Sequence, residues 1–288
     1  MPTVFQSAVV QTVSTPTLPD AVRAAPPSAA IECLGIEKSY PGRRGEPRRI
    51  VLKEASFTAA EGEFVCILGP SGCGKSTFLN ILSGLDTDFQ GEARVHGIDV
   101  TDPRIGGVRS AYIFQEARLL PWRTVQGNLE FALKAAGYPQ QEWAERVDHY
   151  LAMVGMLQFK HLYPGQLSGG MQQRTSIARA FSIEPEVLYM DEPFSALDEL
   201  SARRLRTELL EIWAQHRTTV VFVTHNSFEA TYLADRILIM KRGPESTFAD
   251  EIGLGWLERP RSNESAEVFE ASREVVQRLV TVIGDSPD

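Results

Sequence analysis

A glycine-rich loop constrains this chain more than any other stretch. It matches the phosphate-loop pattern G-x-x-x-x-G-K-[ST]. The loop reads Gly69-Pro70-Ser71-Gly72-Cys73-Gly74-Lys75-Ser76-Thr77. An apolar run at residues 64–68 precedes it, and residues 78–82 follow with the spacing of a helix that buries one face. The stretch therefore predicts a strand, a glycine loop and a helix in that order, which is the context that gives the motif a mechanism.

The mechanism of such a loop is anion binding. Glycines let consecutive backbone N–H groups turn inward around a phosphate, and the positive end of the following helix points to the same place. Lys75 is expected to reach the β- and γ-phosphates, and the Ser76 hydroxyl to ligate Mg²⁺. A glycine-rich turn without a ligand is the alternative, and a nine-residue match between strand and helix disfavours it. The sequence predicts binding of a nucleoside triphosphate.

Composition narrows the class of protein. The 288 residues leave room for one or two domains, and 43% hydrophobic with 23% charged residues is typical of a soluble globular chain. No window approaches the roughly 18 apolar residues of a membrane-spanning helix. The N-terminus lacks the basic start of a secretory signal, so a cytosolic address is expected. The net charge of −8 disfavours a nucleic-acid partner, and three scattered cysteines disfavour disulfides or a metal cluster.

The order of patterns along the chain predicts its domains. Residues 1–30 are rich in Pro, Ala, Ser and Thr and are expected to form a disordered leader. Apolar strands alternate with helical patterns over residues 31–260, which predicts one nucleotide-binding domain with a largely parallel sheet between helices. Helical patterns alone fill about residues 116–182, which predicts an inserted helical subdomain. Residues 261–288 predict an amphipathic helical tail that packs back on its own domain.

Two adjacent carboxylates follow a second apolar run. Asp191 and Glu192 come directly after residues 187–190. One carboxylate at such a strand end can hold Mg²⁺, and a neighbouring one can orient the attacking water or take its proton. Because Mg²⁺ needs few protein ligands, Ser76 and Asp191 suffice, with Gln115 and waters completing the shell. A turn that starts a helix remains the alternative for the acidic pair taken alone.

A third stretch of sequence resembles a motif of a known protein family. The stretch Leu167-Ser168-Gly169-Gly170-Met171-Gln172-Gln173-Arg174 resembles the signature motif of ATP-binding cassette (ABC) ATPases. The order and spacing of the motifs are similar to that family from about residue 31 to residue 240, including the stretches at 191–193, 195–198 and 224–225. The resemblance implies an α/β fold: a P-loop NTPase core with an antiparallel β subdomain and an inserted α-helical subdomain. It also implies ATP hydrolysis in a head-to-tail dimer.

The resemblance implies roles for particular residues. Within one subunit, Tyr40 resembles the aromatic residue that stacks on adenine, and Gln115 the residue that senses Mg²⁺ and the attacking water. Glu192 resembles the catalytic base, and His225 the histidine that contacts the γ-phosphate and positions water. Residues 195–198 resemble the loop through which the two sites of the dimer communicate.

The signature residues are expected to act across the dimer. By resemblance, Ser168, Gly169 and Gly170 cap the γ-phosphate of the ATP held by the second copy of the chain. Ser168 is also the expected N-cap of the helix that follows. The same physical principle applies as in the phosphate loop, because a helix N-terminus again faces an anion.

Two kinds of observation indicate which type of ABC ATPase the chain resembles: the lack of a membrane-spanning segment, and two local stretches of sequence. One cassette without a spanning segment indicates a separate transporter subunit rather than a fused exporter. Residues 114–122 and 190–198 are similar to the ATPases of nitrate, taurine and aliphatic sulfonate importers. Leu119, Leu120 and Trp122 are expected to be exposed, so that residues 116–122 contact a transmembrane permease. Simple coverage of the helical subdomain by these side chains is the alternative.

Together these patterns predict the ATPase subunit of an importer for a small anion such as nitrate, taurine or an alkanesulfonate. We expect a peripheral protein at the cytoplasmic face of the cell membrane, with a periplasmic or extracytoplasmic solute-binding protein as an indirect partner. Another ABC importer, a lipid-trafficking system or a soluble nucleotide switch are the alternatives. Only the basic loop at residues 43–49 supports the switch.

Overall fold

The computed structural model describes residues 29–42, 47–243 and 247–284. The expected leader lies outside these ranges except for Ala29 and Ala30, which already belong to the first strand, β1 (Ala29–Tyr40). Residues 43–46 of the basic loop also lie outside them. No helix in the described ranges has the length and apolar character needed to span a bilayer.

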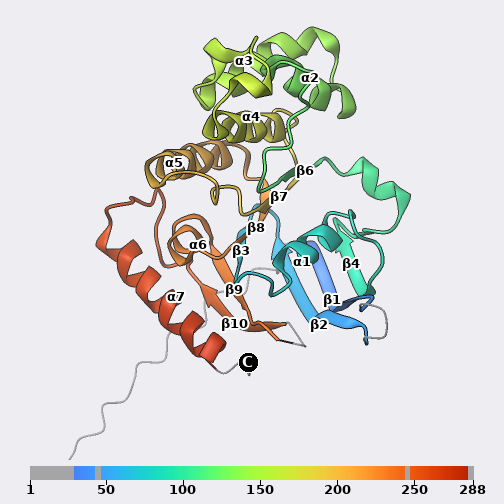
Figure 1. Cartoon of the computed structure of the whole chain (residues 1–288), viewed down its shortest axis with the longest axis vertical. Helices are drawn as coiled ribbons and strands as arrows, with labels where there is room; N and C mark the ends of the chain where they lie inside the picture. The colour runs from blue at the N-terminus through green and yellow to red at the C-terminus, as the bar shows by residue number, and fades with distance from the viewer. Residues whose placement is uncertain (1–28, 43–46, 244–246, 285–288) are drawn as a thin grey trace, which may run out of the picture.

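A six-stranded sheet forms the centre of the molecule (Figure 1). Its strands in spatial order are β10 (Phe248–Gly253), β9 (Arg236–Met240), β3 (Phe64–Leu68), β8 (Thr219–Thr224), β7 (Val187–Asp191) and β6 (Ser110–Ile113). All neighbours pair in parallel except β10, which runs antiparallel to β9. Every residue of β3 and β8 is buried, because both faces of a parallel sheet are covered by other elements. The expected parallel sheet is confirmed, and the antiparallel edge strand β10 is an addition.

A second, antiparallel sheet lies beside the first. Its strands are ordered β2 (Arg49–Ala60), β1, β4 (Gln90–Val95) and β5 (Ile98–Asp99). Helix α1 (Lys75–Leu82) shares one hydrophobic core with both sheets, and the rings of Phe57 and Phe78 meet edge to face at 6.1 Å. The phosphate loop before α1 therefore sits where the two sheets meet.

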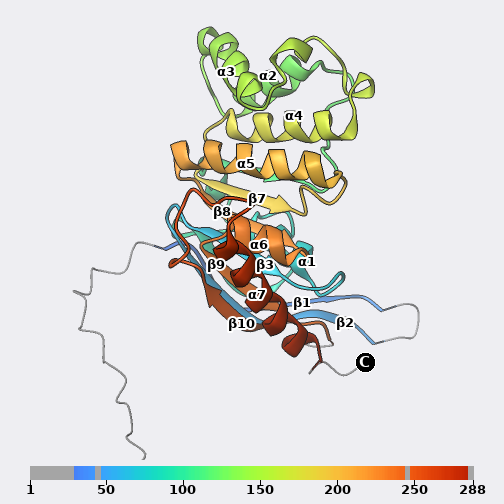
Figure 2. The same cartoon turned by 90° about the vertical axis from the view of Figure 1, so that its left-hand side faces the viewer.

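Some of the remaining helices cover the central sheet, and others form a helical region beyond one end of it (Figure 1 and Figure 2). Helices α2 (Val125–Ala135), α3 (Trp143–Met153) and α4 (Gly169–Phe181) pack together above α5 (Glu199–His216), as both views show (Figure 2). Short 3₁₀ turns at Gln140–Glu142, Leu157–Phe159 and Pro164–Gln166 lie between α2 and α4, and another at Pro103–Gly107 lies between β5 and β6. Ser168 caps α4 as expected, because its Oγ accepts a hydrogen bond from Met171 N at 3.3 Å.

The last helix returns to the domain. Helix α7 (Ala266–Gly284) buries Val268, Ala271 and Val275 and packs against α6 (Ser227–Leu233). This agrees with the amphipathic pattern of the tail, which repeats apolar residues at helical spacing.

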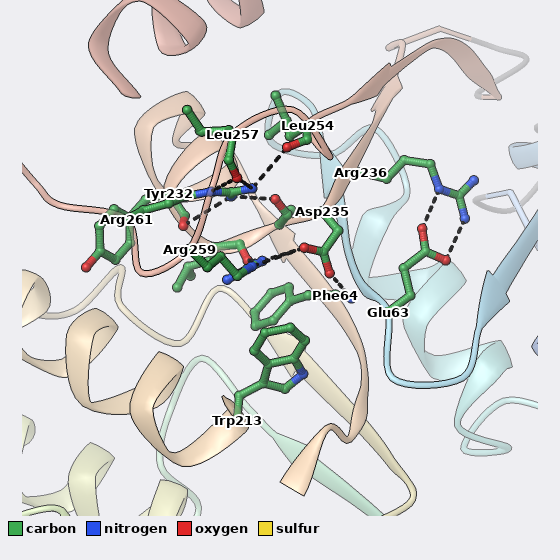
Figure 3. A network of polar contacts seen from close by, with 12 residues as sticks. Glu63, Phe64, Trp213, Tyr232, Asp235, Arg236, Leu254, Leu257, Arg259 and Arg261 are labelled. Carbon is green, nitrogen blue, oxygen red and sulfur yellow. Dashed lines mark hydrogen bonds and ion pairs between the residues drawn. The ribbon is translucent and has the colours of Figure 1, made fainter. Parts of the chain in front are cut away.

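Two arginines fasten the segment that leads to α7 (Figure 3). Arg261 is buried and donates to Ala234 O at 2.6 Å and to Thr231 O at 2.7 Å, and so satisfies carbonyls left open at the end of α6. Burial lowers the pKa of Arg261 to about 10. Arg259 donates to Asp235 Oδ1 at 2.8 Å. The chain after β10 is thereby held to the end of α6.

Candidate active site

The phosphate loop has a backbone that only glycine adopts easily. Gly72 and Gly74 have φ angles of 79° and 105°, in the left-handed region. A Cβ on Gly69 would lie 2.6 Å from Met240 O, which is closer than real contacts allow. The loop conformation is therefore tied to its glycines, and α1 begins directly after it.

Lys75 lies inside the hollow of the loop. Its side chain is almost fully buried, and Nζ donates to Gly69 O at 2.8 Å and to Pro70 O at 3.0 Å. The same ammonium lies 3.5 Å from Oε1 of Glu192. A buried cation held by carbonyls and one carboxylate is placed to meet a phosphate group entering the loop.

Ser76 and Asp191 offer oxygen ligands side by side. Ser76 Oγ donates to Asp191 Oδ1 at 2.9 Å, which joins the start of α1 to the end of β7. Burial raises the pKa of Asp191 above its ordinary value, and the hydrogen bond from Ser76 opposes that shift. The described residues contain no cluster of three His, Cys, Asp or Glu side chains suited to a metal. Two adjacent hard oxygen donors nevertheless fit Mg²⁺, which keeps most of its water ligands.

Glu192 contacts both Lys75 and His225 at the carboxyl end of the sheet. Its Oε2 lies 2.8 Å from His225 Nδ1, while Oε1 faces Lys75. Glu192 has a φ of 43°, and its N–H donates to Val223 O at 3.0 Å. A left-handed non-glycine residue costs about 1–3 kcal/mol and is typical of functional sites. Because β3, β8 and β7 are neighbours, their ends bring Lys75, His225 and Glu192 together.

Lys75, Ser76 and Glu192 line a cleft of about 630 Å³, which we call the phosphate-loop cleft. Asp191 and His225 do not line it themselves and reach it through their contacts with Ser76 and Glu192. Of the residues predicted for the site, its lining includes Tyr40, Ser71, Gly72, Gly74, Lys75, Ser76, Thr77, Gln115 and Glu192. Pro41, Arg49 and Val51 also line it and were not predicted. The position of Arg49 follows from strand pairing, since Tyr40 of β1 pairs directly with Arg49 of β2.

Tyr40 is half exposed at the rim of the cleft. Its hydroxyl donates to Asp86 Oδ2 at 3.2 Å, and the Lys38 ammonium lies 4.9 Å from the ring centroid. The ring therefore lies beside the cleft. Cys73, in contrast, is fully buried, and burial raises the pKa of its thiol, which disfavours the reactive thiolate.

The signature residues lie apart from the cleft of their own chain. Ser168 and Gly169 are exposed at the N-terminus of α4, and none of Ser168, Gly169 and Gly170 lines the cleft. Gly170 instead faces the loop after β7, because a Cβ there would lie 3.6 Å from Leu197 Cδ2. The structure thus brings the phosphate loop and the carboxylates together but leaves the signature motif on an outer surface.

The apolar segment at residues 116–122 is only partly exposed. Trp122 is 71% exposed, as expected. The expectation for Leu119 and Leu120 is wrong, because both are half-buried: Leu119 packs against the central core, and Leu120 N donates to Asn128 Oδ1 at 2.7 Å. The buried Asn128 side chain fastens this segment to α2, which pulls the leucines inward.

A second hollow lies between the helical layer and the sheet. This groove of about 580 Å³ runs between α2, α4 and residues 105–112. Ala132, Ala135 and Ala136 line it, together with Phe131, which is 46% exposed. We call it the α2–α4 groove. Its lining is more apolar than that of the phosphate-loop cleft, although Arg109 and Arg179 also belong to it.

The fold and the cleft define a phosphate-loop ATPase. The ABC transporter family model matches residues 52–195. The chain is 41% identical over 236 residues to the nitrate import ATP-binding protein NrtD of Synechococcus elongatus, covering 81% of this chain and 83% of that protein. It is 43% identical over 240 residues to the bicarbonate transport ATP-binding protein CmpD of Synechocystis sp., covering 82% and 83%.

Solved structures agree with the sequence comparison. The post-hydrolysis dimer of the ATP-binding cassette MJ0796, bound to ADP and Pi, aligns with a TM-score of 0.69 at 31% identity, over 78% of this chain and 98% of that one. The chain therefore belongs to the ABC transporter family and is an ABC ATPase. The predicted fold, with its antiparallel β subdomain and helical insertion, is confirmed.

Proposed function

We propose that this chain hydrolyses ATP to energise the import of a small anion such as nitrate, taurine or an alkanesulfonate. The observation that carries the hydrolysis is the set of contacts joining Lys75, Glu192 and His225 beside the Ser76–Asp191 pair. The importer assignment is supported by the relatives, which are named as nitrate and bicarbonate transport proteins. The substrate itself is chosen by transport components other than this chain.

The chemistry follows from the residues around the cleft. Lys75 and the loop N–H groups hold the β- and γ-phosphates, and Tyr40 stacks on adenine at the rim. Ser76, Asp191 and Gln115 hold Mg²⁺, which supplies positive charge to the phosphate oxygens. Water attacks the γ-phosphorus in line with the bond to the β-phosphate oxygen, and that bond breaks.

Glu192 and His225 handle the attacking water. Glu192 takes the proton that the water loses, and His225 orients the water and contacts the γ-phosphate. The contact of 2.8 Å between the two side chains supports this division, because it fixes the carboxylate beside the imidazole. The water oxygen forms the new bond to the γ-phosphorus and leaves in the inorganic phosphate, while the β-phosphate oxygen of the broken bond leaves in ADP.

The second copy of the chain completes the site. We infer that Ser168, Gly169 and Gly170 of one copy cap the γ-phosphate bound to the other in a head-to-tail homodimer. Their exposure at the N-terminus of α4, away from their own cleft, supports this arrangement. The dimers described for MJ0796 support it as well.

A transmembrane permease docks at residues 116–122 and the α2–α4 groove. The exposed Trp122 in this segment and the exposed Phe131 in the alanine-lined groove support an apolar contact with a helix of the partner. The chain then lies peripherally on the cytoplasmic face of the cell membrane and reaches a solute-binding protein only through the permease.

One experiment tests the proposal as a whole. Tagged Glu192→Gln protein is purified from membranes in the presence of ATP, and the proteins that accompany it are identified. Recovery of a permease that is encoded beside a solute-binding protein supports the importer. Recovery of soluble partners or nucleic acid alone contradicts it.

A further inference from the structure

A buried ion pair joins α5 and α6. Arg206 of α5 is 1% exposed, and its Nη1 donates to Oε1 of Glu229 of α6 at 3.3 Å. The Glu229 side chain is only 8% exposed, and burial raises its pKa above the ordinary value. Buried ion pairs add little net stability compared with apolar residues of the same size. Fold stability alone therefore does not explain this pair.

The second oxygen of Glu229 reaches the strand end that carries His225. Thr224 Oγ1 donates to Glu229 Oε2 at 2.7 Å, and it accepts a hydrogen bond from Asn226 N at 3.0 Å. Asn226 in turn caps α6, since its Oδ1 accepts from Phe228 N at 2.9 Å. The backbone on both sides of His225 is thus fixed by a chain of bonds that begins at one buried carboxylate.

Arg206 also reaches the first residue of its own helix, directly after the loop at residues 195–198. Its Nη2 donates to Glu199 Oε1 at 2.6 Å, at the first turn of α5. The preceding residue, Asp198, caps the same helix by accepting from Ser201 N at 3.0 Å. Arg206 therefore connects the start of α5, directly after the loop at residues 195–198, with the turn that carries His225. Helices α5 and α6 are in contact, which makes this connection short (Figure 1).

We propose that Arg206 and Glu229 are positioning residues that orient His225 for hydrolysis and couple it to the loop at residues 195–198. The inference rests on the proposed role of His225 in the reaction. Both side chains are buried, and neither residue lines the phosphate-loop cleft. Without the pair, ATP still binds through Lys75 and the loop, but the imidazole loses its fixed orientation and turnover falls.

The test compares three variants with a matched control. Glu229→Gln removes the charge and keeps the shape, Arg206→Met removes the donors, and Thr224→Val removes only the hydroxyl that links Glu229 to the turn. The control is Arg203→Met, on the same helix, which breaks the exposed ion pair with Glu264 at 2.8 Å. All are measured for kcat, for KM of ATP and for melting temperature.

We expect kcat to fall about tenfold or more in the three variants, because a small misplacement of a reacting group is costly, while KM changes by less than about twofold. Arg206→Lys is expected to restore part of the loss, and Arg203→Met to behave as wild type. A histidine NMR spectrum should show a changed His225 signal in Glu229→Gln but not in the control.

Different failures have different meanings. If His225→Ala hydrolyses ATP like wild type, the proposed function of the site fails. If His225→Ala is inactive while folded Thr224→Val and Glu229→Gln keep wild-type kcat, only the positioning role is overturned. A loss of kcat matched by an equal loss of ATP affinity also overturns it. If the charge variants do not fold, Thr224→Val decides the question, since it changes a single hydroxyl.

Discussion

His225 Nδ1 lies 2.8 Å from Oε2 of Glu192, and the other oxygen of that carboxylate lies 3.5 Å from the ammonium of Lys75. One side chain thus joins the ends of two strands to the phosphate loop. The position requires a left-handed backbone at Glu192, with a φ of 43°. A carboxylate fixed between an ammonium group and an imidazole is the arrangement on which the first prediction depends.

Glu192→Gln should bind ATP and hydrolyse it very slowly. The amide keeps the size of the side chain but cannot take a proton, so we expect kcat to fall by about 10²–10⁴. ATP affinity should be retained, and gel filtration with ATP should show a trapped dimer. Turnover at the wild-type rate would show that Glu192 is not the base.

Lys75→Ala should lose ATP affinity rather than turnover alone. The substitution removes the ammonium group that the loop holds through Gly69 O and that we propose to contact the phosphates, and a charge-assisted hydrogen bond contributes about 1.5–3 kcal/mol. A rise in Kd of roughly 10- to 100-fold follows from that energy. Titration with a fluorescent ATP analogue measures it, and Lys134→Ala on the exposed face of α2 is the control. Equal affinity in both variants would contradict the assignment.

Trp122→Ala and Phe131→Ala should weaken the interaction with the permease and spare ATP hydrolysis. Both side chains are exposed, Phe131 lines the α2–α4 groove, and neither residue lines the phosphate-loop cleft. The measurement is the amount of protein bound to membranes that contain the permease. Trp256→Ala is the matched control, because Trp256 is 59% exposed after β10. Equal loss of binding in the control would indicate a general effect of removing surface aromatics.

The phosphate loop and the carboxylates could be predicted because their signals are local. A run of glycines ending in Lys75 and Ser76, or an acidic pair after an apolar run, is readable within ten residues. The strand β10 was missed because its short, partly charged sequence has few apolar residues and gains its place from pairing with β9. Strand pairing of this kind is a tertiary effect that overrides weak local patterns.

The buried pair of Arg206 and Glu229 was missed for a related reason. Arg203, Arg204 and Arg206 lie within one turn of α5, yet only Arg206 is buried. The helical period alone favours it, since Ala202 and Leu209 on the same face are also buried. No feature of the sequence near Arg206 identifies its partner Glu229, which lies 23 residues further along the chain. Buried charges find their partners through the fold, which a single sequence does not contain.

Arg261→Met should destabilise the chain without changing its chemistry. Arg261 donates to carbonyls of Thr231, Ala234 and Leu254, and the apolar side chain would leave these buried acceptors open (Figure 3). The loss is on the order of 3 kcal/mol, since each buried unsatisfied group costs about 1–3 kcal/mol. Urea unfolding measures it. Arg273→Met on the exposed face of α7 is the control, and equal midpoints in the two variants would contradict the anchoring role.

Acid should destabilise the fold through His216, at the end of α5. Its Nε2 lies 3.2 Å from the hydroxyl of Tyr150, and burial lowers the pKa of His216 below its ordinary value near 6.5. The folded chain therefore keeps the ring neutral while the unfolded chain takes up a proton. Its contribution to stability is complete above pH 6.5 and is lost as the pH falls from there toward the folded-state pKa.

The substitution His216→Gln should therefore flatten the dependence of stability on pH. Melting temperatures between pH 7.5 and pH 5.5 (roughly one unit on either side of an ordinary histidine pKa) should fall less in the variant than in wild type. His161→Gln, at an exposed position, is the control and should keep the wild-type slope. Parallel slopes in all three proteins would show that the fold does not depend on a neutral His216.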